Sequence, residues 1–295
     1  MENSTNAHEV SESSANTNTA TGLPDPALFE DTRETNWLAM ILALAAFGGL
    51  AWVHSLFSAR IEYALLELRT ATAGLIGPAL AVNLVALGVL ALVIFGVGRG
   101  RPADVGWRLA AILPALLSTA ALWIALQLIL VVLAALGWGA LAWHEHWQRP
   151  LHVVGSFLGQ LLGTALLEET VFRGFLLPQI YLKARRHYQW ASALCIALLA
   201  SQLAFGLVHL PTHVAVRNIE GWGLAHGQLS LLVFGLIHAG LYMATRNLFL
   251  CVGLHVISNE PASLAAVSGE PVQFALFGLV AAIGFAWLFV WWLRR

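Results

Sequence analysis

Charged residues are scarce in this chain. Only 11% of its 295 residues are charged, whereas 59% are hydrophobic, and the mean hydropathy is +0.75. A soluble domain carries about 25% charged residues, so this chain has too few to cover the surface of a globule. The composition excludes an ordinary soluble enzyme and predicts an all-α integral membrane protein.

Cysteine and an excess of basic charge are also missing. The two cysteines, Cys195 and Cys251, lie within apolar runs, which indicates neither a disulfide framework nor a cysteine zinc cluster. The formal net charge is -1, and the basic runs at 185–186 and 294–295 are too short to follow a phosphate backbone. We therefore expect no nucleic-acid partner.

The first 35 residues differ from the rest because they are rich in Ser, Asn, Thr and acidic side chains. Such a segment cannot bury enough apolar surface to offset its ordering entropy, so we predict a disordered acidic tail over 1–35. It also lacks the basic stretch followed by an apolar run that marks a signal peptide.

Beyond the tail, apolar runs of helical length predict about eight membrane-spanning helices. We assign 36–149 to N-terminal transmembrane helices and 150–295 to a transmembrane core. Two polar connections, 58–73 and 178–189, are predicted to lie along the membrane surface. The predicted spans are 37–57, 74–97, 110–136, 152–177, 190–210, 228–245, 248–268 and 271–293.

The basic residues of the predicted loops are distributed unequally between the two faces of the membrane. The richer face should be cytoplasmic, which places both termini inside. The single lysine and the abundance of Ala, Leu and Trp are typical of a bacterial chain, so we expect the bacterial inner membrane. The richer face holds Arg33, Arg99, Arg101, Arg108, Lys183, Arg185, Arg186, Arg246, Arg294 and Arg295, and the other holds Arg60, Arg69, Arg149 and Arg217.

Ionisable groups within a span are costly, and they indicate a functional site. One group of them lies in span 152–177. Glu169 and Arg173 are four residues apart, so on a helix they share a face and can pair, although such a pair is also typical of simple helix packing. The neighbouring Glu168 is left without a local cation. It needs a partner on another helix, a metal ion or water, and it could then act as a general base or acid.

Further polar groups lie in two other spans. His255 and Asn259 are also four residues apart, so they project side by side, and His209 comes from a separate helix. Together with Glu168 these groups predict a site for a divalent metal ion, and the imidazole donors favour zinc. His152, His187, His213, His226 and His238 we interpret as packing residues, and we expect Pro211 to end or bend its helix.

The predicted boundaries conflict with a shared site in one respect. They put His209 near the outer end of its span and His255 near the cytoplasmic end of another. Straight helices that all begin at the same level would keep these two side chains apart.

Taken in order, Glu168-Glu169-x-x-x-Arg173, Phe205-x-x-x-His209 and His255-x-x-x-Asn259 resemble the three signature motifs of the CPBP family. This family comprises the type II CAAX prenyl endopeptidases and bacterial relatives that include abortive-infection-type membrane proteins. The resemblance covers roughly residues 150–262, and the eight-helix layout is similar to the family's fold.

The resemblance implies an intramembrane endopeptidase that acts on a membrane-associated substrate, including a prenylated or lipid-linked one. It implies that Glu168 activates a water molecule and that His209 and His255 hold a metal ion or the water. Asn259 would complete that site or stabilise an oxyanion. Glu169 and Arg173 would fix the helix and steer the substrate.

Other functions compete with this interpretation. Glu168 and the histidines could form a proton or cation relay in a transporter, or the polar cluster could hold together a non-catalytic scaffold. Other protease chemistries lack their motifs, because the chain has no His-Glu-x-x-His, no Gly-x-Ser-x-Gly and no aspartate in a predicted span.

Overall fold

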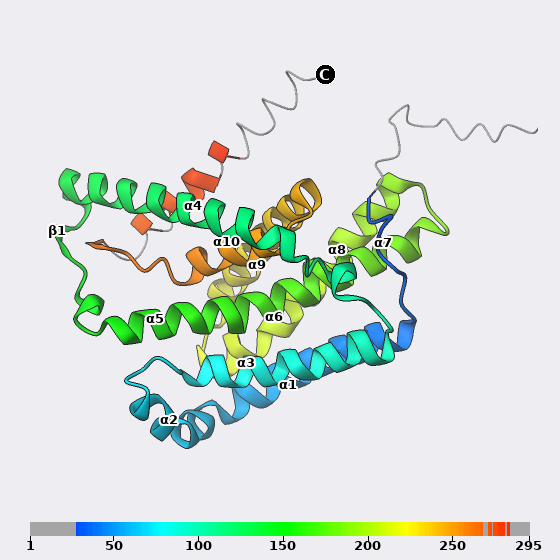
Figure 1. Ribbon diagram of the computed structural model, residues 1–295, viewed down its shortest axis with the longest axis horizontal. Helices are drawn as coiled ribbons and strands as arrows, with labels where there is room; N and C mark the ends of the chain where they lie inside the picture. Colours follow the sequence, from blue (N-terminus) through cyan, green and yellow to red (C-terminus); the bar gives the residue numbers. More distant parts are fainter. Residues whose placement is uncertain (1–27, 268–270, 273, 281, 284–295) are drawn as a thin grey trace, which may run out of the picture.

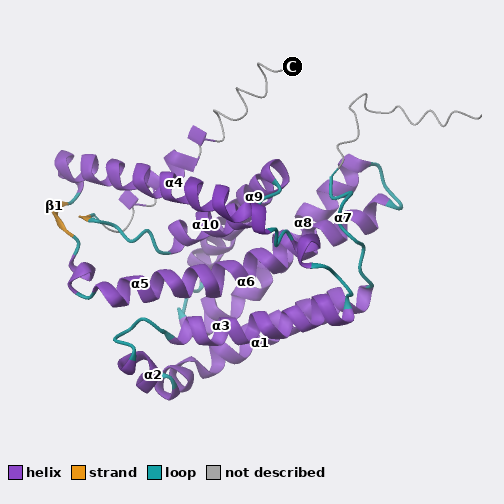
Figure 2. Cartoon of the chain, viewed as in Figure 1, coloured by secondary structure: helices purple, strands orange, loops and turns teal. Residues whose placement is uncertain are grey.

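The structure is a computed structural model, and it describes residues 28–267, 271–272, 274–280 and 282–283. Almost all of the described chain is helical, and the two short strands pair at one end of the molecule (Figure 2). Most of the large apolar side chains on α1 and α4 face outward, such as Leu56 and Leu117. An outward-facing apolar surface is expected in lipid, so the structure is that of an all-α membrane protein.

Six helical segments of the described chain are long and apolar enough to cross a membrane. They are Trp37–Ala64, Pro78–Val97, Pro102–Trp138, Pro150–Arg185, Trp190–Val216 and Gly221–Thr245. Within them the α-helices are α1 (Trp37–Ala64), α3 (Pro78–Ala91), α4 (Ile112–Leu133), α5 (Pro150–Leu158), α6 (Leu166–Glu169), α7 (Leu177–Arg185), α8 (Trp190–Pro211) and α9 (Gly221–Thr245). The remaining elements are α2 (Leu66–Ala71), α10 (Leu248–Asn259), β1 (Ala140–Trp143) and β2 (Ala265–Ala266).

Several helix ends are defined by local sequence. Asn36 caps α1 by accepting a hydrogen bond from the Ala39 amide at 2.7 Å, and Asn247 caps α10 in the same way through Leu250. Proline stands at the first position of α3 and α5, where its missing N–H costs nothing. These signals explain why the starts of α1, α3 and α5 lie within a few residues of the predicted span starts.

The predicted span 248–268 is a short helix followed by an extended segment. Helix α10 has only 12 residues and ends at Asn259, and the chain then reaches β2, which pairs antiparallel with β1. The prediction of one continuous helix was wrong there, because Glu260 and Pro261 interrupt the apolar run. Much of the predicted span 271–293 lies outside the described residues, so eight spans stay a prediction.

The two connections expected on the membrane surface also differ from the prediction. Helix α1 continues to Ala64, so only α2 forms a separate short helix in 58–73. The segment 178–189 is mostly the end of the long helix Pro150–Arg185. Lys183 is buried there and donates to the Glu34 carboxylate at 2.8 Å instead of reaching lipid headgroups.

The predicted disordered tail is ordered over the eight residues of it that the structure describes, 28–35. Phe29 is buried against Tyr181 and Tyr242, and the Thr35 amide donates to Gln179 at 2.7 Å. Phe29 supplies apolar area that the polar composition of the segment as a whole conceals. The prediction for residues 1–27 lies outside the described residues.

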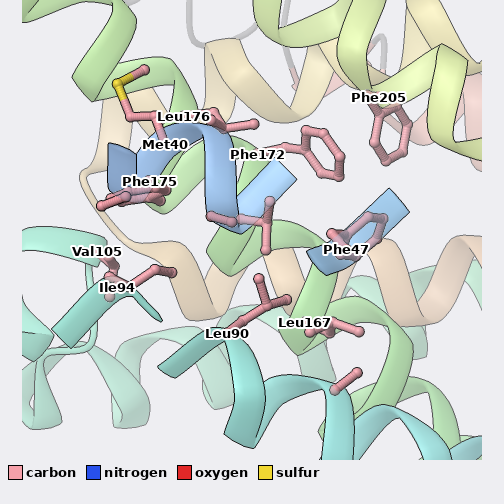
Figure 3. Packing of buried hydrophobic residues seen from close by; sticks show 14 residues of the cluster. Met40, Phe47, Leu90, Ile94, Val105, Leu167, Phe172, Phe175, Leu176 and Phe205 are labelled. Atoms are coloured by element: carbon pink, nitrogen blue, oxygen red, sulfur yellow. The ribbon is translucent and has the colours of Figure 1, made fainter. Parts of the chain in front are cut away.

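The helices that carry the site are held by an aromatic core. Figure 3 shows Phe172 between Phe47 of α1 and Phe205 of α8, and both pairs meet edge to face with ring centroids 5.2 and 5.0 Å apart. Side chains of the same core reach α3 through Leu90. Figure 1 shows α3 lying beside α1 and the long α5–α7 helix. This packing fixes α8 against the helix that carries the two glutamates.

Candidate functional site

The two glutamates lie midway along the helix Pro150–Arg185, in the short α-helical stretch α6. A π-helical turn precedes this stretch at Gly159–Ala165, and another follows it at Thr170–Leu176. Such wide turns are rare and frequently occur at functional sites, where they alter the direction in which side chains project. Both Glu168 and Glu169 point inward, with 8% and 0% of their surface exposed.

Glu168 lies between two imidazole rings that come from different helices. Its Oε1 is 3.6 Å from Nε2 of His209 on α8, and its Oε2 is 3.8 Å from Nε2 of His255 on α10. The structure therefore brings together three residues that are up to 87 positions apart in the sequence, 168 to 255.

The second nitrogen of each ring is already engaged, which determines what its Nε2 can do. Nδ1 of His209 donates to the Phe205 carbonyl at 2.7 Å, and Nδ1 of His255 donates to Glu169 Oε1 at 2.8 Å. In a neutral ring the proton is then on Nδ1, so each Nε2 presents a lone pair toward Glu168. Two nitrogen lone pairs and a carboxylate facing one another can hold a water molecule or a cation.

Glu169 and Arg173 form the ion pair that their spacing predicts. Nη1 of Arg173 is 3.3 Å from Glu169 Oε1, and both side chains are at most 1% exposed. The guanidinium also lies 4.6 Å from the Phe205 ring centroid and donates to the Gly235 carbonyl at 3.4 Å. Arg173 therefore links the glutamate helix to both α8 and α9.

Asn259 lies at the exposed end of α10. Its amide donates to Gln160 Oε1 at 3.1 Å, rather than to Glu168 or the two imidazoles. Gln160 belongs to the π-helical turn before α6. The structure thus places Asn259 one turn beyond His255, as the spacing predicts, at the rim of the site.

Residues 150–260 match the family model described as Rce1-like, the type II CAAX prenyl endopeptidases. This range includes all six predicted site residues. This part of the chain is similar to an Rce1-like domain, which supports a relationship to the CPBP/CAAX protease family. The family indicates an intramembrane endopeptidase of the CAAX type. Searches of curated proteins and of solved structures found no match to the chain.

The structure explains how His209 and His255 come together although the predicted spans put them at different depths in the membrane. Helix α8 begins 19 residues before His209 (190 to 209), whereas α10 begins only seven residues before His255 (248 to 255). The start of α10 is therefore much nearer the site than the start of α8. The conflict arose because the prediction let all spans begin at the same level.

Pro211 does not end the helix that carries His209. The helical segment continues through the proline to Val216, with a π-helical turn at Thr212–Val216. His213 consequently stays near the site, with its ring centroid 6.5 Å from that of His209, and its Nδ1 lies 3.4 Å from the Gln228 amide nitrogen. The proline removes one backbone donor without breaking the apolar packing around it.

His238 on α9 also belongs to this cluster, although the sequence pattern indicated only a packing residue. One ligating atom each of Glu169, His238 and His255 lie within 4.8 Å of one another. The ring of His238 meets that of His255 edge to face at 5.5 Å. No motif surrounds this histidine in span 228–245. The one feature of the sequence that could have indicated a functional role is that an ionisable side chain within a membrane is energetically unfavourable.

Two imidazoles and a carboxylate, the groups around Glu168, are of the kinds that bind divalent metal ions, although among the described residues the group whose ligating atoms all lie within 4.8 Å of one another is Glu169, His238 and His255. Bonds of about 2.0–2.2 Å in a tetrahedral zinc site place ligand atoms about 3.3–3.6 Å apart. His209 Nε2 lies 3.6 Å from Oε1 of Glu168 and His255 Nε2 lies 3.8 Å from Oε2, so the two rings approach different oxygens of the carboxylate. In addition, the carboxylate of Glu169 orients the His255 ring in the way common for metal-binding histidines.

Proposed function

We propose that the chain is an intramembrane endopeptidase in which Glu168 activates the water that attacks a peptide carbonyl. The observation that carries this is the position of the Glu168 carboxylate between the Nε2 atoms of His209 and His255, 3.6 and 3.8 Å away. A carboxylate so placed can accept a proton from a water molecule held by the imidazoles.

In the proposed hydrolysis, Glu168 first accepts a proton and then donates it. Glu168 removes a proton from water as the water oxygen bonds to the carbonyl carbon. It then gives that proton to the departing amine as the carbon–nitrogen bond breaks, which leaves a free amine and a carboxylic acid that loses its remaining proton to solvent. The exposed amide of Asn259 at the rim supplies a hydrogen-bond donor for the carbonyl oxygen as negative charge develops there.

A zinc ion or another divalent metal would be held by Glu168, His209 and His255, with Asn259 as a further oxygen donor. When bound, such an ion lowers the pKa of a bound water molecule and polarises the carbonyl. Metal analysis of the purified protein tests this assignment. We expect about one zinc ion per chain, and its loss in His209→Ala.

The test of the proteolytic assignment is cleavage by purified protein in lipid nanodiscs. The probe is a fluorescence-quenched, farnesylated peptide that ends in a CAAX sequence, and mass spectrometry identifies the cut bond. Glu168→Gln keeps the size of the side chain but cannot take up the proton, so kcat should fall by about 10²–10⁴-fold. Glu67→Gln, at an exposed glutamate of α2, is the matched control and should cleave normally. Unchanged cleavage by Glu168→Gln would exclude the role proposed for this residue.

An apolar cavity beside the site supports a lipid-modified substrate. It has a volume of about 560 Å³ and lies between α4, the long α5–α7 helix and α10. Its lining includes Leu166, two residues before Glu168, and Val252, three residues before His255. We propose that the isoprenoid chain of the substrate occupies this cavity while the peptide lies at Glu168.

Filling the cavity tests this placement. Ala120→Trp adds bulk to its lining, so KM should rise for the farnesylated peptide, by about 10-fold if most of the chain contact is lost, and stay unchanged for the unprenylated peptide. The neighbouring Ala121 is exposed and does not line the cavity, which makes Ala121→Trp the control. Equal effects on both peptides would argue against the cavity as the isoprenoid site.

A further inference from the structure

The two carboxylate oxygens of the buried Glu169 have different surroundings. Oε1 accepts the hydrogen bond from His255 Nδ1 at 2.8 Å and lies 3.3 Å from Arg173 Nη1. Oε2 has no hydrogen-bond partner among the described residues, although it is shielded from solvent. A buried acceptor without a partner is costly and calls for an explanation.

His238 on α9 has an atom in the same condition. Its side chain is 3% exposed, and Nδ1 donates to the Phe234 carbonyl at 2.7 Å. Nε2 of the neutral ring is therefore an acceptor, and it too lacks a hydrogen-bond partner within the described part of the chain. The backbone around it is fixed, because the Cys251 thiol of α10 donates to the His238 carbonyl at 3.6 Å.

These two acceptors belong to one cluster. One carboxylate oxygen of Glu169 and one ring nitrogen of His238 lie within 4.8 Å of each other, so the two side chains are close enough for one water molecule to bridge them by donating two hydrogen bonds of about 2.8 Å. A cation at this position is disfavoured, because Arg173 already contacts the same carboxylate and the Nδ1 proton of His255 points at it. A donor that is neutral, small and able to serve both acceptors fits the cluster best.

We propose that His238 is a positioning residue for the site, which holds Glu169 through a bridging water molecule. Glu169 held in this way keeps its Oε1 on the Nδ1 proton of His255. His255 then keeps the lone pair of its Nε2 directed at Glu168. The chain of contacts thus runs from α9 through the buried glutamate to the reacting group, and its catalytic consequence rests on the function proposed above.

Two substitutions separate positioning from packing. His238→Phe keeps the size of the ring and removes both nitrogens. His238→Gln places an amide near the position of Nε2, from which it can donate to Glu169 directly. We expect His238→Phe to lower kcat for the farnesylated peptide about 10–100-fold with little change in KM, and His238→Gln to restore most of it. His226→Phe, at an exposed histidine of the same helix, is the control and should leave kcat unchanged.

A second measurement does not depend on cleavage. In protein labelled with ¹⁵N-histidine, the spectrum should show His255 protonated on Nδ1 alone, with the signal assigned by its loss in His255→Gln. In His238→Phe this signal should broaden or shift toward a mixture of tautomers, while His226→Phe leaves it unchanged. If His238→Phe is not recovered folded, the smaller His238→Leu takes its place.

Each outcome decides the proposal. An unchanged His255 signal in His238→Phe, or a kcat that His238→Gln does not restore, would overturn it. If the wild-type protein cleaves neither peptide, the proposed function fails, and the ¹⁵N spectrum alone still decides whether His238 positions His255.

Discussion

The polar residues of the site are stabilised by one another rather than by water. Glu169 and Arg173 are both fully buried, and each relies on the other for charge compensation. His255 joins this pair to Glu168 through its hydrogen bond to Glu169 at 2.8 Å and its 3.8 Å contact with Glu168, so we expect a change at one residue of the cluster to affect the others.

Arg173 should therefore be a major determinant of stability. Arg173→Met leaves the Glu169 carboxylate buried without a cation, which should cost about 3–5 kcal/mol and lower the Tm measured in detergent. Removing the charge from both partners in Glu169→Gln/Arg173→Met should recover part of that loss. A double variant that is less stable than Arg173→Met would show that the pair is not the source of the effect.

The sequence predicts the contacts of this cluster that lie within one helix, but not those between helices. The Glu169–Arg173 pair and the adjacency of His255 and Asn259 follow from helical spacing, which is local. The hydrogen bond from His255 to Glu169 and the place of His238 are not local. They depend on how α9 and α10 pack against α6, and no spacing within one helix contains that information.

At the scale of elements, the end of the long helix Pro150–Arg185 is fastened by the segment that precedes α1. Glu34 accepts from Lys183 at 2.8 Å and from Arg186 at 2.6 Å, and Lys183 also donates to the Thr35 carbonyl. Burial alone would raise the pKa of Glu34, but the hydrogen bond and charge of Lys183, together with Arg186, outweigh it and hold the pKa below its ordinary value of 4.5.

This attachment should weaken in acid. Because the folded-state pKa of Glu34 is lowered, its contribution to stability is complete above about pH 4.5 and is lost as the pH falls through the lower folded value. As the pH falls below about 4.5, the backbone amides of residues 28–36 should exchange hydrogen faster than the change in their intrinsic exchange rates with pH accounts for. Glu34→Gln should exchange quickly at neutral pH also, whereas Glu30→Gln, at an exposed carboxylate of the same segment, should behave as the wild type. Identical exchange in the wild type and Glu34→Gln would contradict this role.

At the scale of the whole molecule, the ends of the helices alternate between two faces. Figure 1 shows α2 and β1 at one end, and α7 with the starts of α1 and α8 at the other. The eight described basic residues of the richer predicted set fall in the segments 33, 99–108, 183–186 and 246, and the poorer set has four. The predicted Arg294 and Arg295 lie outside the described residues. This asymmetry still predicts that the face with α7 is cytoplasmic.

Cysteine labelling in intact cells tests this orientation. Gln148→Cys and His187→Cys are exposed positions at opposite ends of the molecule, and each is made in a chain with Cys195→Ser and Cys251→Ala. A membrane-impermeant maleimide should label Gln148→Cys in intact cells and His187→Cys only after lysis. The reverse pattern would place the termini outside.

The sequence by itself determined that this is a helical membrane protein with costly ionisable groups in three of its helices. Composition and unbroken apolar runs suffice for that, because lipid tolerates few alternatives to the helix. The tertiary structure alone decided that α10 begins close to the site, that residues 28–35 are ordered, and that His238 joins the cluster. Helix depth, helix contacts and the partners of buried polar atoms arise from packing between distant segments. The hydropathy of the chain, which depends on neighbouring residues alone, does not predict that packing.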